Sequence, residues 1–412
     1  MKPRTSTAAL LPLEISSTPR MSASLLALLA CASGLSVANV YYAQPLLDAI
    51  AADFSITRAA IGGVVTATQV GCALALIFLV PLGDLVSRRR LMLMQALALV
   101  AALALVTLSN SAVVLLIGML ATGLFGTAMT QGLIAYAASA AGDTERGHVV
   151  GTTQAGVFIG LLLARVVSGG VSDVAGWRGI YGVASVAMLI LATMLYRALP
   201  DIPTSSSRMS YPRLLSSLLG LLRDERVLRI RGTLAFLMFA VFNVFWSALV
   251  LPLSEAPYRF SHTIIGAFGL VGALGALAAG RAGRWADRGL GERATGWAMG
   301  LLVVAWLPLA SMHASLWWLA LGIVLLDASG QIIHVTNQSL ILRRRPDAHG
   351  RLIGVYMLFY ATGSGAGAMA TTAVYARFEW VGVCALGAAV GLAALLFWVA
   401  TVDRAELTRA KV

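Results

Sequence analysis

The chain has 412 residues, of which 59% are hydrophobic and only 12% are charged. Its mean hydropathy of +0.84 is far above that of soluble domains, which excludes a soluble enzyme or a soluble binding protein. The formal net charge of +12 would suit a nucleic-acid partner in a soluble protein, but basic residues in a membrane protein mark its cytoplasmic side. We therefore expect a polytopic protein of the lipid bilayer, with no nucleic-acid partner.

The chain is expected to cross the membrane twelve times, because a helix needs about 20 apolar residues to span about 30 Å of hydrocarbon. Residues 1–20 are polar and rich in Pro, Ser and Thr, so we expect a disordered tail there. The twelve apolar runs lie near residues 24–47, 58–82, 91–108, 112–138, 149–171, 177–197, 232–253, 263–282, 294–310, 315–341, 352–375 and 380–401.

The orientation follows from the positions of the 30 Lys and Arg residues. Of these, 25 fall in the tails and in the loops on one side, with Arg231 counted in the loop before the seventh run. Only four fall on the opposite side, and Arg165 lies inside a run. Basic residues accumulate in cytoplasmic loops, so the pattern predicts cytoplasmic termini in a bacterial-type inner membrane.

The first and fourth runs carry polar side chains that need partners in hydrocarbon. Asn39, Tyr42 and Gln44 lie in the outer half of the first run, and Gln131 lies in the fourth. Such residues either join neighbouring helices or line a substrate cavity, and the sequence leaves both readings open.

The fifth run contains Arg165, whose insertion at the bilayer centre would cost roughly 2.5 to 3.5 kcal/mol. A residue of this cost should face protein or water. We interpret Arg165 as a gate or a substrate contact in the periplasmic half; the alternative is an arginine that caps carbonyl groups or extends towards the interface.

Residues 198–230 form the longest predicted loop, which joins the two halves of the chain. Its Pro203–Ser207 segment is typical of a linker, and Leu214 to Leu222 predict a short amphipathic helix on the membrane surface. In the seventh run that follows, Asn243 and Trp246 are three residues apart and share a face, where they line a cavity or pack in the core.

The tenth run has a polar stripe. Asp327, Gln331, His334 and Gln338 recur at intervals of three or four residues, which places them on one helix face, with Asn337 beside them. Asp327 is the only acid deep within a run and His334 the only histidine, so both are candidates for proton coupling. The alternatives are a structural network or a standing ion pair of Asp327 with Arg165. No second His or carboxylate stands at metal-ligand spacing, so we expect no metal and no cofactor.

The chain contains an internal duplication. The segment from Val80 to Arg90 returns as Gly283 to Arg293, with an offset of 203 residues between Asp84 and Asp287. The same offset brings Trp177 onto Trp380, and Gly147 and Gly151 onto Gly350 and Gly354. A repeated half explains this register. We expect an N-terminal six-helix half (21–197), a linker (198–230), a C-terminal six-helix half (231–402) and a tail (403–412).

The two hairpins resemble the cytoplasmic signature of the major facilitator superfamily, Gly-x-x-x-Asp-Arg-x-Gly-Arg-Arg. The first copy departs from it at Val80, Leu85 and Ser87. The resemblance implies an all-α membrane protein whose twelve transmembrane helices form two pseudo-symmetric bundles of six, with a central cavity lined by the first, fourth, seventh and tenth helices. It also implies that the hairpins act as cytoplasmic gates; their matching residues are Asp84, Arg88, Arg89, Arg90, Gly283, Asp287 and Arg288.

The segment Gly160 to Gly170 is similar to a motif of the antiporter branch of this superfamily, with Ala164 and Arg165 in place of Gly and Pro. The resemblance therefore implies a monomeric secondary transporter that exports a small organic molecule in exchange for protons, with Asp327 as the leading proton site. Uptake by symport or facilitated diffusion is the alternative. A membrane sensor or enzyme is a remote one, because the sequence offers no nucleophile–base pair, metal cluster or phosphate loop.

Overall fold

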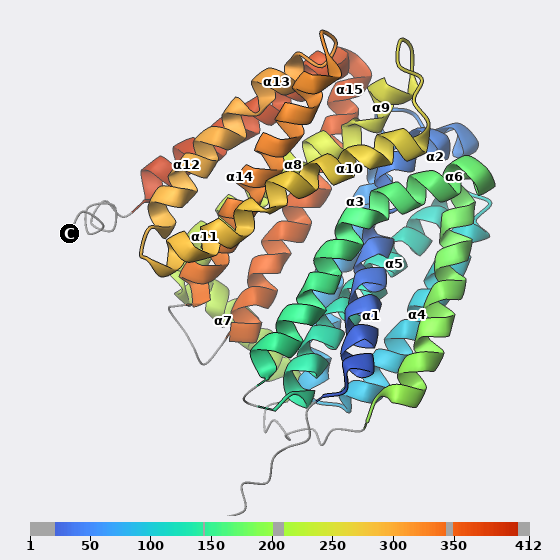
Figure 1. Cartoon of the computed structure of the whole chain (residues 1–412), viewed down its shortest axis with the longest axis vertical. Coiled ribbons are helices and arrows are strands. Elements are labelled where there is room, and N and C mark those ends of the chain that lie inside the picture. Colours follow the sequence, from blue (N-terminus) through green and yellow to red (C-terminus); the bar gives the residue numbers. More distant parts are fainter. Residues whose placement is uncertain (1–20, 143–144, 201–209, 343–348, 403–412) are drawn as a thin grey trace, which may run out of the picture.

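A computed structural model describes residues 21–142, 145–200, 210–342 and 349–402, and within these ranges the chain forms helices and no strands. The predicted tails at 1–20 and 403–412 and the Pro203–Ser207 segment lie outside the described residues. Figure 1 shows two groups of steeply inclined helices that lie side by side.

The N-terminal group begins with a helix whose first turn is capped by Ser22, whose hydroxyl accepts a hydrogen bond from the Leu25 amide. Ser87 and Ser111 cap two later helices in the same way. The elements of this group are α1 (Ala23–Tyr41), η1 (Gln44–Leu46), α2 (Leu47–Phe54), α3 (Gly62–Leu74), η2 (Ala75–Leu79), η3 (Pro81–Asp84), α4 (Arg88–Thr107), α5 (Ala112–Ala140) and α6 (Arg146–Ala198).

The C-terminal group follows a connecting helix, α7 (Tyr211–Asp224). Its elements are α8 (Arg226–Ala248), α9 (Val250–Ser254), α10 (His262–Ala276), α11 (Ala278–Asp287), α12 (Gly291–Val304), α13 (Trp306–Ala310), α14 (Leu316–Leu342) and α15 (His349–Thr401).

Ten helical stretches in the described part of the chain are long and apolar enough to cross a membrane. Two of them, α6 and α15, are 53 residues long, and each contains one residue with a non-helical backbone. The twelve predicted runs map onto these ten stretches, because the fifth and sixth runs fall in α6 and the last two in α15.

The non-helical residues in α6 and α15 occupy equivalent positions in the two halves of the internal duplication. Gly176 has φ 71° and Glu379 has φ 50°, and the two positions are again 203 residues apart. The residue after each break is a tryptophan whose indole N–H is bonded: Trp177 donates to Asp53 at 3.0 Å and Trp380 to the Leu309 carbonyl at 2.9 Å. The halves therefore share a bend and a hydrogen-bonded tryptophan after it, although the partner is a carboxylate in one half and a backbone carbonyl in the other.

The two groups meet along two helix pairs, α6 with α10 and α3 with α15. Small residues allow these backbones to approach closely: a Cβ added at Gly266 would lie 2.2 Å from the Arg165 carbonyl oxygen, and one at Gly62 would lie 2.3 Å from that of Ala368. We call the end of the molecule that carries α2 and α9 the distal end, and the end that carries α7 the linker end (Figure 1).

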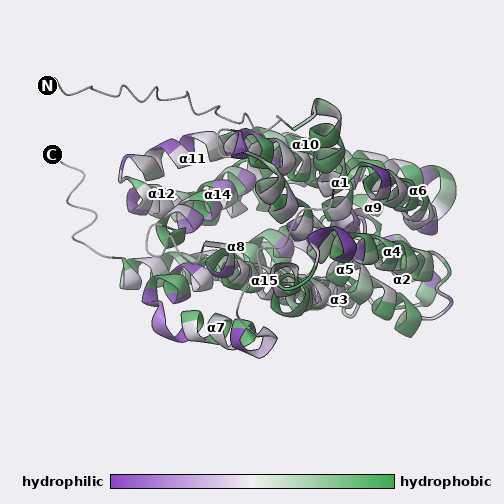
Figure 2. Ribbon diagram, turned by 90° about the horizontal axis from the view of Figure 1, so that it is seen from below, coloured by the Kyte–Doolittle hydropathy of each residue, from purple (hydrophilic) through white to green (hydrophobic). Residues whose placement is uncertain are grey.

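The connecting helix α7 touches both groups. Leu214 and Leu221 are buried, and Leu221 belongs to a small cluster with Ile341 and Tyr356 of the C-terminal group. The Tyr211 hydroxyl donates to the Phe78 carbonyl of the N-terminal group at 2.9 Å. In Figure 2, α7 lies at the edge of the bundle and carries both hydrophilic and hydrophobic residues.

Candidate functional site

A chain of buried polar side chains links the two groups in the distal half of the molecule. Arg165 of α6 is 3% exposed, and its Nε donates a hydrogen bond to Gln44 Oε1 at 3.0 Å. The Gln44 amide in turn donates to Asn243 Oδ1 on α8 at 3.2 Å. Three residues predicted separately from the sequence are thus brought together, and their bonds run from α6 through η1 to the other group.

The Arg165 guanidinium also lies against aromatic rings. Its centre is 4.0 Å from the Trp246 ring and 5.7 Å from the Tyr41 ring, within the range of cation–π attraction. The Tyr41 hydroxyl is hydrogen-bonded to that of Tyr360 on α15. One guanidinium nitrogen, Nη2, is buried without a hydrogen-bond partner among the described residues. The arginine is therefore held in place but keeps donor capacity.

Asp327 of α14 supplies the opposite charge from the other group. It is 7% exposed, interacts electrostatically with Arg165, and its Oδ2 has no hydrogen-bond partner among the described residues. Arg165 and Asp327 form no ion pair within 4.0 Å in the described structure. A buried carboxylate and a buried guanidinium that lack hydrogen-bond partners are costly in free energy unless a ligand, a proton or a second conformation provides those partners.

Both charged side chains depend on glycines of α10 for their space. A Cβ added at Gly269 would lie 3.4 Å from Arg165 Cδ, and one at Gly272 would lie 2.6 Å from Asp327 Oδ2. Sequence reasoning missed this series of glycines, which Gly266 and Gly275 extend at intervals of three residues. The series winds around α10, so that Gly266 and Gly269 lie against α6 and Gly272 and Gly275 against α14. Repeated glycines in a membrane helix were the available signal, because small residues allow a close approach.

The structure is closed around the guanidinium. The cavity lined by Gln44, Arg165 and Trp246 has a volume of about 10 Å³, which is close to the smallest space that holds one water molecule. No group of three or more His, Cys, Asp or Glu side chains in the described residues could hold a metal ion.

The rest of the α14 stripe contacts other elements. His334 Nδ1 lies 3.0 Å from the Tyr356 hydroxyl, and the ring packs edge-on against Phe239. The Gln338 amide donates to His334 Nε2 at 3.2 Å. Gln331, between Asp327 and His334, has a buried Oε1 without a partner among the described residues. Asp327 thus faces α10 and Arg165, whereas His334 faces α8 and α15.

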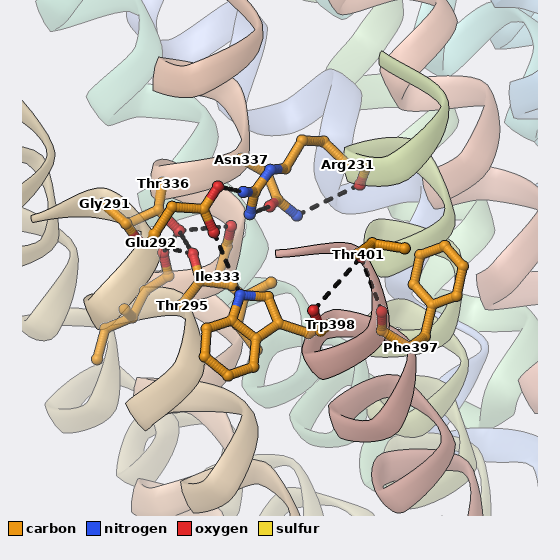
Figure 3. A network of polar contacts seen from close by, with 11 residues as sticks. Arg231, Gly291, Glu292, Thr295, Ile333, Thr336, Asn337, Phe397, Trp398 and Thr401 are labelled. Carbon is orange, nitrogen blue, oxygen red and sulfur yellow. Dashed lines mark hydrogen bonds and ion pairs between the residues drawn. The ribbon is translucent and has the colours of Figure 1, made fainter. Parts of the chain in front are cut away.

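Asn337 belongs to a second buried network (Figure 3). Its Oδ1 accepts from Arg231 Nη1 at 3.4 Å, and Arg231 forms an ion pair with Glu292, whose Oε2 accepts from the Trp398 indole at 3.3 Å. Counting Arg231 as a loop residue was wrong: it lies in α8 and is 4% exposed. Burial is tolerated because Glu292, itself 8% exposed, neutralises its charge. Asp327 is therefore not the only buried acid.

Three other cavity candidates lie within the N-terminal group. Asn39 is buried, and its amide donates to the Leu35 carbonyl of its own helix at 2.8 Å. Tyr42 is buried edge-on against Tyr181 of α6, and Gln131 of α5 is half-buried. None of the three has a described hydrogen bond to Arg165 or Asp327.

The two hairpins lie at the linker end, and the side chains of Asp84 and Asp287 are outside what the structure describes. Arg88 donates to the carbonyls of Gly83 at 3.1 Å and Ala135 at 2.7 Å, which joins the first hairpin to α5. Arg89 donates to the Tyr196 carbonyl at 2.8 Å. The remaining hairpin residues are an exposed Arg90, an exposed Arg288 and Gly283, beside which a Cβ would meet nothing within 4 Å.

At the distal end, ionic contacts between the groups close the molecule. The His262 ring at the start of α10 lies between two carboxylates, with Nε2 at 3.0 Å from Asp48 and Nδ1 at 3.3 Å from Asp173. Arg58 and Glu255 form a second, exposed ion pair across the groups. We call these five residues the distal latch. Sequence reasoning missed it, since polar residues in loops carry no pairing signal.

Comparisons with known proteins place these observations in a family. A family model described as Major Facilitator Superfamily matches residues 26–304. The uncharacterized transporter YgaY of Escherichia coli O157:H7 is 40% identical over 378 residues, which are 92% of this chain and 95% of that protein.

Two solved structures share the architecture at low sequence identity. A variant of the nucleoside transporter NupG has a TM-score of 0.73 and 13% identity, with 92% of this chain and 100% of that one covered. The D-xylose-proton symporter has a TM-score of 0.69 and 15% identity, with 91% and 97% covered. At these identities the likeness shows the fold alone.

Proposed function

Because this chain belongs to the major facilitator superfamily of membrane transporters, we propose that it exports a small organic molecule in exchange for protons, by alternating access. The observation that carries the proposal is the incompletely paired set of Arg165 and Asp327 between the two groups. These buried charges come from opposite sides of the interface that alternating access must open and close. Both groups belong to one chain, so we propose that a monomer is the working unit.

Protonation of Asp327 is the proposed coupling step. The deprotonated carboxylate attracts Arg165 of the other group, and a proton on Asp327 removes this attraction. Proton occupancy therefore biases how closely α6 and α14 approach, which is a differential stabilisation of two conformations. The glycines of α10 allow this movement, because Gly269 and Gly272 place no side chain beside the two charged groups.

Competition between cargo and proton would give exchange. The unpaired Asp327 Oδ2 is a stronger hydrogen-bond acceptor for a cargo while the carboxyl group is deprotonated, and Arg165 Nη2 offers a donor from the other group. Cargo binding would then expel the proton. Trp246 and Tyr41, which flank the guanidinium, offer ring faces to a cargo with apolar surface. His334 is the second proton candidate, but its described partners lie on other elements.

The distribution of basic residues supports the proposed orientation. Without Arg231, which is buried in α8, the side that includes the linker keeps 24 of the 30 Lys and Arg residues, so we propose that the linker end and both termini face the cytoplasm of a bacterial-type inner membrane. The distal latch then closes the periplasmic side. The hairpin arginines Arg88 and Arg89, which join helices at the linker end, are proposed to take part in cytoplasmic gating.

Transport into proteoliposomes tests the proposal and its direction. Vesicles with an acidic interior should accumulate a labelled cargo from a screened panel by exchange, whereas symport would require an acidic exterior. Asp327→Asn should abolish the response to the pH gradient but leave cargo movement down its own gradient. Wild-type transport at the same rate with an acidic interior and with an acidic exterior would contradict proton coupling.

A further inference from the structure

The outer surface of the C-terminal group carries a groove that is separate from the Arg165 site. It has a volume of about 520 Å³, within the range typical of small-molecule sites, and lies between α12 and the last turns of α15. Trp297 lines it and is 83% exposed, so this surface points away from the bundle. In a membrane protein such a surface faces lipid.

The groove follows one face of α12. Arg293, Gly296, Gly300 and Val304 recur at intervals of three or four residues and all line it. A Cβ added at Gly300 would meet nothing within 4 Å, so the absence of a side chain leaves open space there. A Cβ at Gly296 would lie 2.3 Å from the Trp398 ring, which forms the opposite wall.

The other half of the chain does not have these residues. At the offset of 203 residues, Leu93 and Leu97 stand where Gly296 and Gly300 do, and Leu195 stands where Trp398 does. Arg90 corresponds to Arg293. The repeated architecture therefore does not by itself require the open space. Arg90 has the same charge as Arg293 without the glycines of the groove, so it provides a matched control.

The Trp398 wall of the groove is held by a hydrogen bond on the side that faces the bundle. The Trp398 indole donates to Glu292, which is paired with Arg231 inside the C-terminal group (Figure 3). This network sets the orientation of the ring. Rotation of the Trp398 side chain would break this hydrogen bond, so this wall of the groove is held in place.

We propose that the groove binds one acyl chain of an anionic phospholipid, with the lipid phosphate on Arg293. The walls are apolar, as an acyl chain requires, and Arg293 stands in the first turn of α12, at the end that the proposed orientation places in the cytoplasmic headgroup layer. A guanidinium has five N–H donors, so a phosphate can share it with other partners. The charge of Arg293 complements an anionic headgroup and selects against a zwitterionic one.

Native mass spectrometry of the purified full-length protein tests this site. The detergent-solubilised protein is titrated with dioleoyl phosphatidylglycerol or with dioleoyl phosphatidylcholine, which differ only in the headgroup. The wild type should retain one phosphatidylglycerol more tightly than phosphatidylcholine. Arg293→Gln should weaken that binding about fivefold, and its counterpart Arg90→Gln should leave it unchanged.

Substitutions that fill the groove test whether it binds an acyl chain. Gly300→Leu should abolish the tight binding of phosphatidylglycerol, and Val304→Phe, at the other end of the groove, should weaken it. If either variant fails to fold, the other still decides the question. Equal retention of both lipids by the wild type, or undiminished binding by the folded variants, would overturn the proposal.

Discussion

Among the residues that the structure describes, two arginines and two acids are buried, and the resulting two pairs differ in how completely their hydrogen bonds are satisfied. Arg231 and Glu292 lie within the C-terminal group, form a direct ion pair, and have further bonds from Asn337 and Trp398 (Figure 3). Arg165 and Asp327 lie on opposite sides of the interface between the groups, and each keeps a polar atom without a described partner.

From this difference we infer a structural role for Arg231 and Glu292 and propose a functional role for Arg165 and Asp327. A saturated pair within one group has nothing left to offer a proton or a cargo, and it keeps α8, α12 and α15 together. A pair that keeps unused hydrogen-bonding capacity, at the interface that is proposed to open and close, is poorly suited to stabilising one state. We propose that this pair responds to protonation.

The largest effect is expected from Glu292→Gln. The substitution leaves the Arg231 charge buried without neutralisation, which should cost about 3 to 5 kcal/mol of unfolding free energy. We expect a sharp loss of folded protein in size-exclusion profiles and a lower Tm in detergent. The double variant Arg231→Met/Glu292→Met should recover most of the loss, and an unchanged Tm in the single variant would refute the structural role.

Arg165→Lys should impair transport more than folding. Lysine keeps the charge but cannot donate from Nε to Gln44 or stack its planar head on Trp246. Loss of a charge-assisted hydrogen bond should reduce the initial rate of transport in vesicles by roughly tenfold to a hundredfold. The amount of folded protein should stay near that of the wild type, and a wild-type rate would argue against a role at the site.

The distal latch should respond to pH through His262. The ring attracts Asp48 and Asp173 by charge only while it is protonated, so a fall in pH should favour the closed distal end and a rise should weaken it. His262→Gln should shift the closed-to-open ratio about threefold to tenfold towards open and should remove this pH response.

Spin labels at Thr57→Cys and Ala256→Cys, in a background without the three native cysteines, would report the distance across the distal end. The predicted result is a longer distance in the variant at acidic pH. A distance distribution that responds to pH equally in both proteins would assign the response to another group.

Arg58→Gln should have the smallest effect. Arg58 and Glu255 are about half exposed, with side-chain exposures of 58% and 46%. Exposed pairs contribute about 0 to 1 kcal/mol and are screened by salt. The same distance measurement should therefore change little, and less still at high salt; a shift as large as that of His262→Gln would reverse the proposed ranking within the latch.

The architecture was predictable from the sequence because it depends on long-range regularities. Apolar runs, the 203-residue offset and the hairpin signature each extend over many positions, and the breaks at Gly176 and Glu379 fall in the register that Trp177 and Trp380 indicate. Arg165 and Asp327 could also be identified as candidate site residues from the sequence, because a charged side chain in hydrocarbon is costly.

The partners of single residues were not predictable, because they depend on packing between distant helices. Asn337 and Gln338 are neighbours in sequence, yet one faces Arg231 and the other His334. Arg231 stands at the edge of an apolar run, where a basic residue ordinarily marks a loop. Only the folded structure shows that the Glu292 side chain of α12 reaches Arg231 of α8.

Proton release on cargo binding tests the central claim most directly. Purified protein in weakly buffered solution is mixed with each cargo of the panel, and a pH indicator records released protons for the wild type, Asp327→Asn and His334→Gln. We predict release by the wild type and by His334→Gln, and none by Asp327→Asn although cargo still binds. Release that persists in Asp327→Asn, or cargo binding by the wild type without any release, would contradict the assignment of Asp327 as the coupling site.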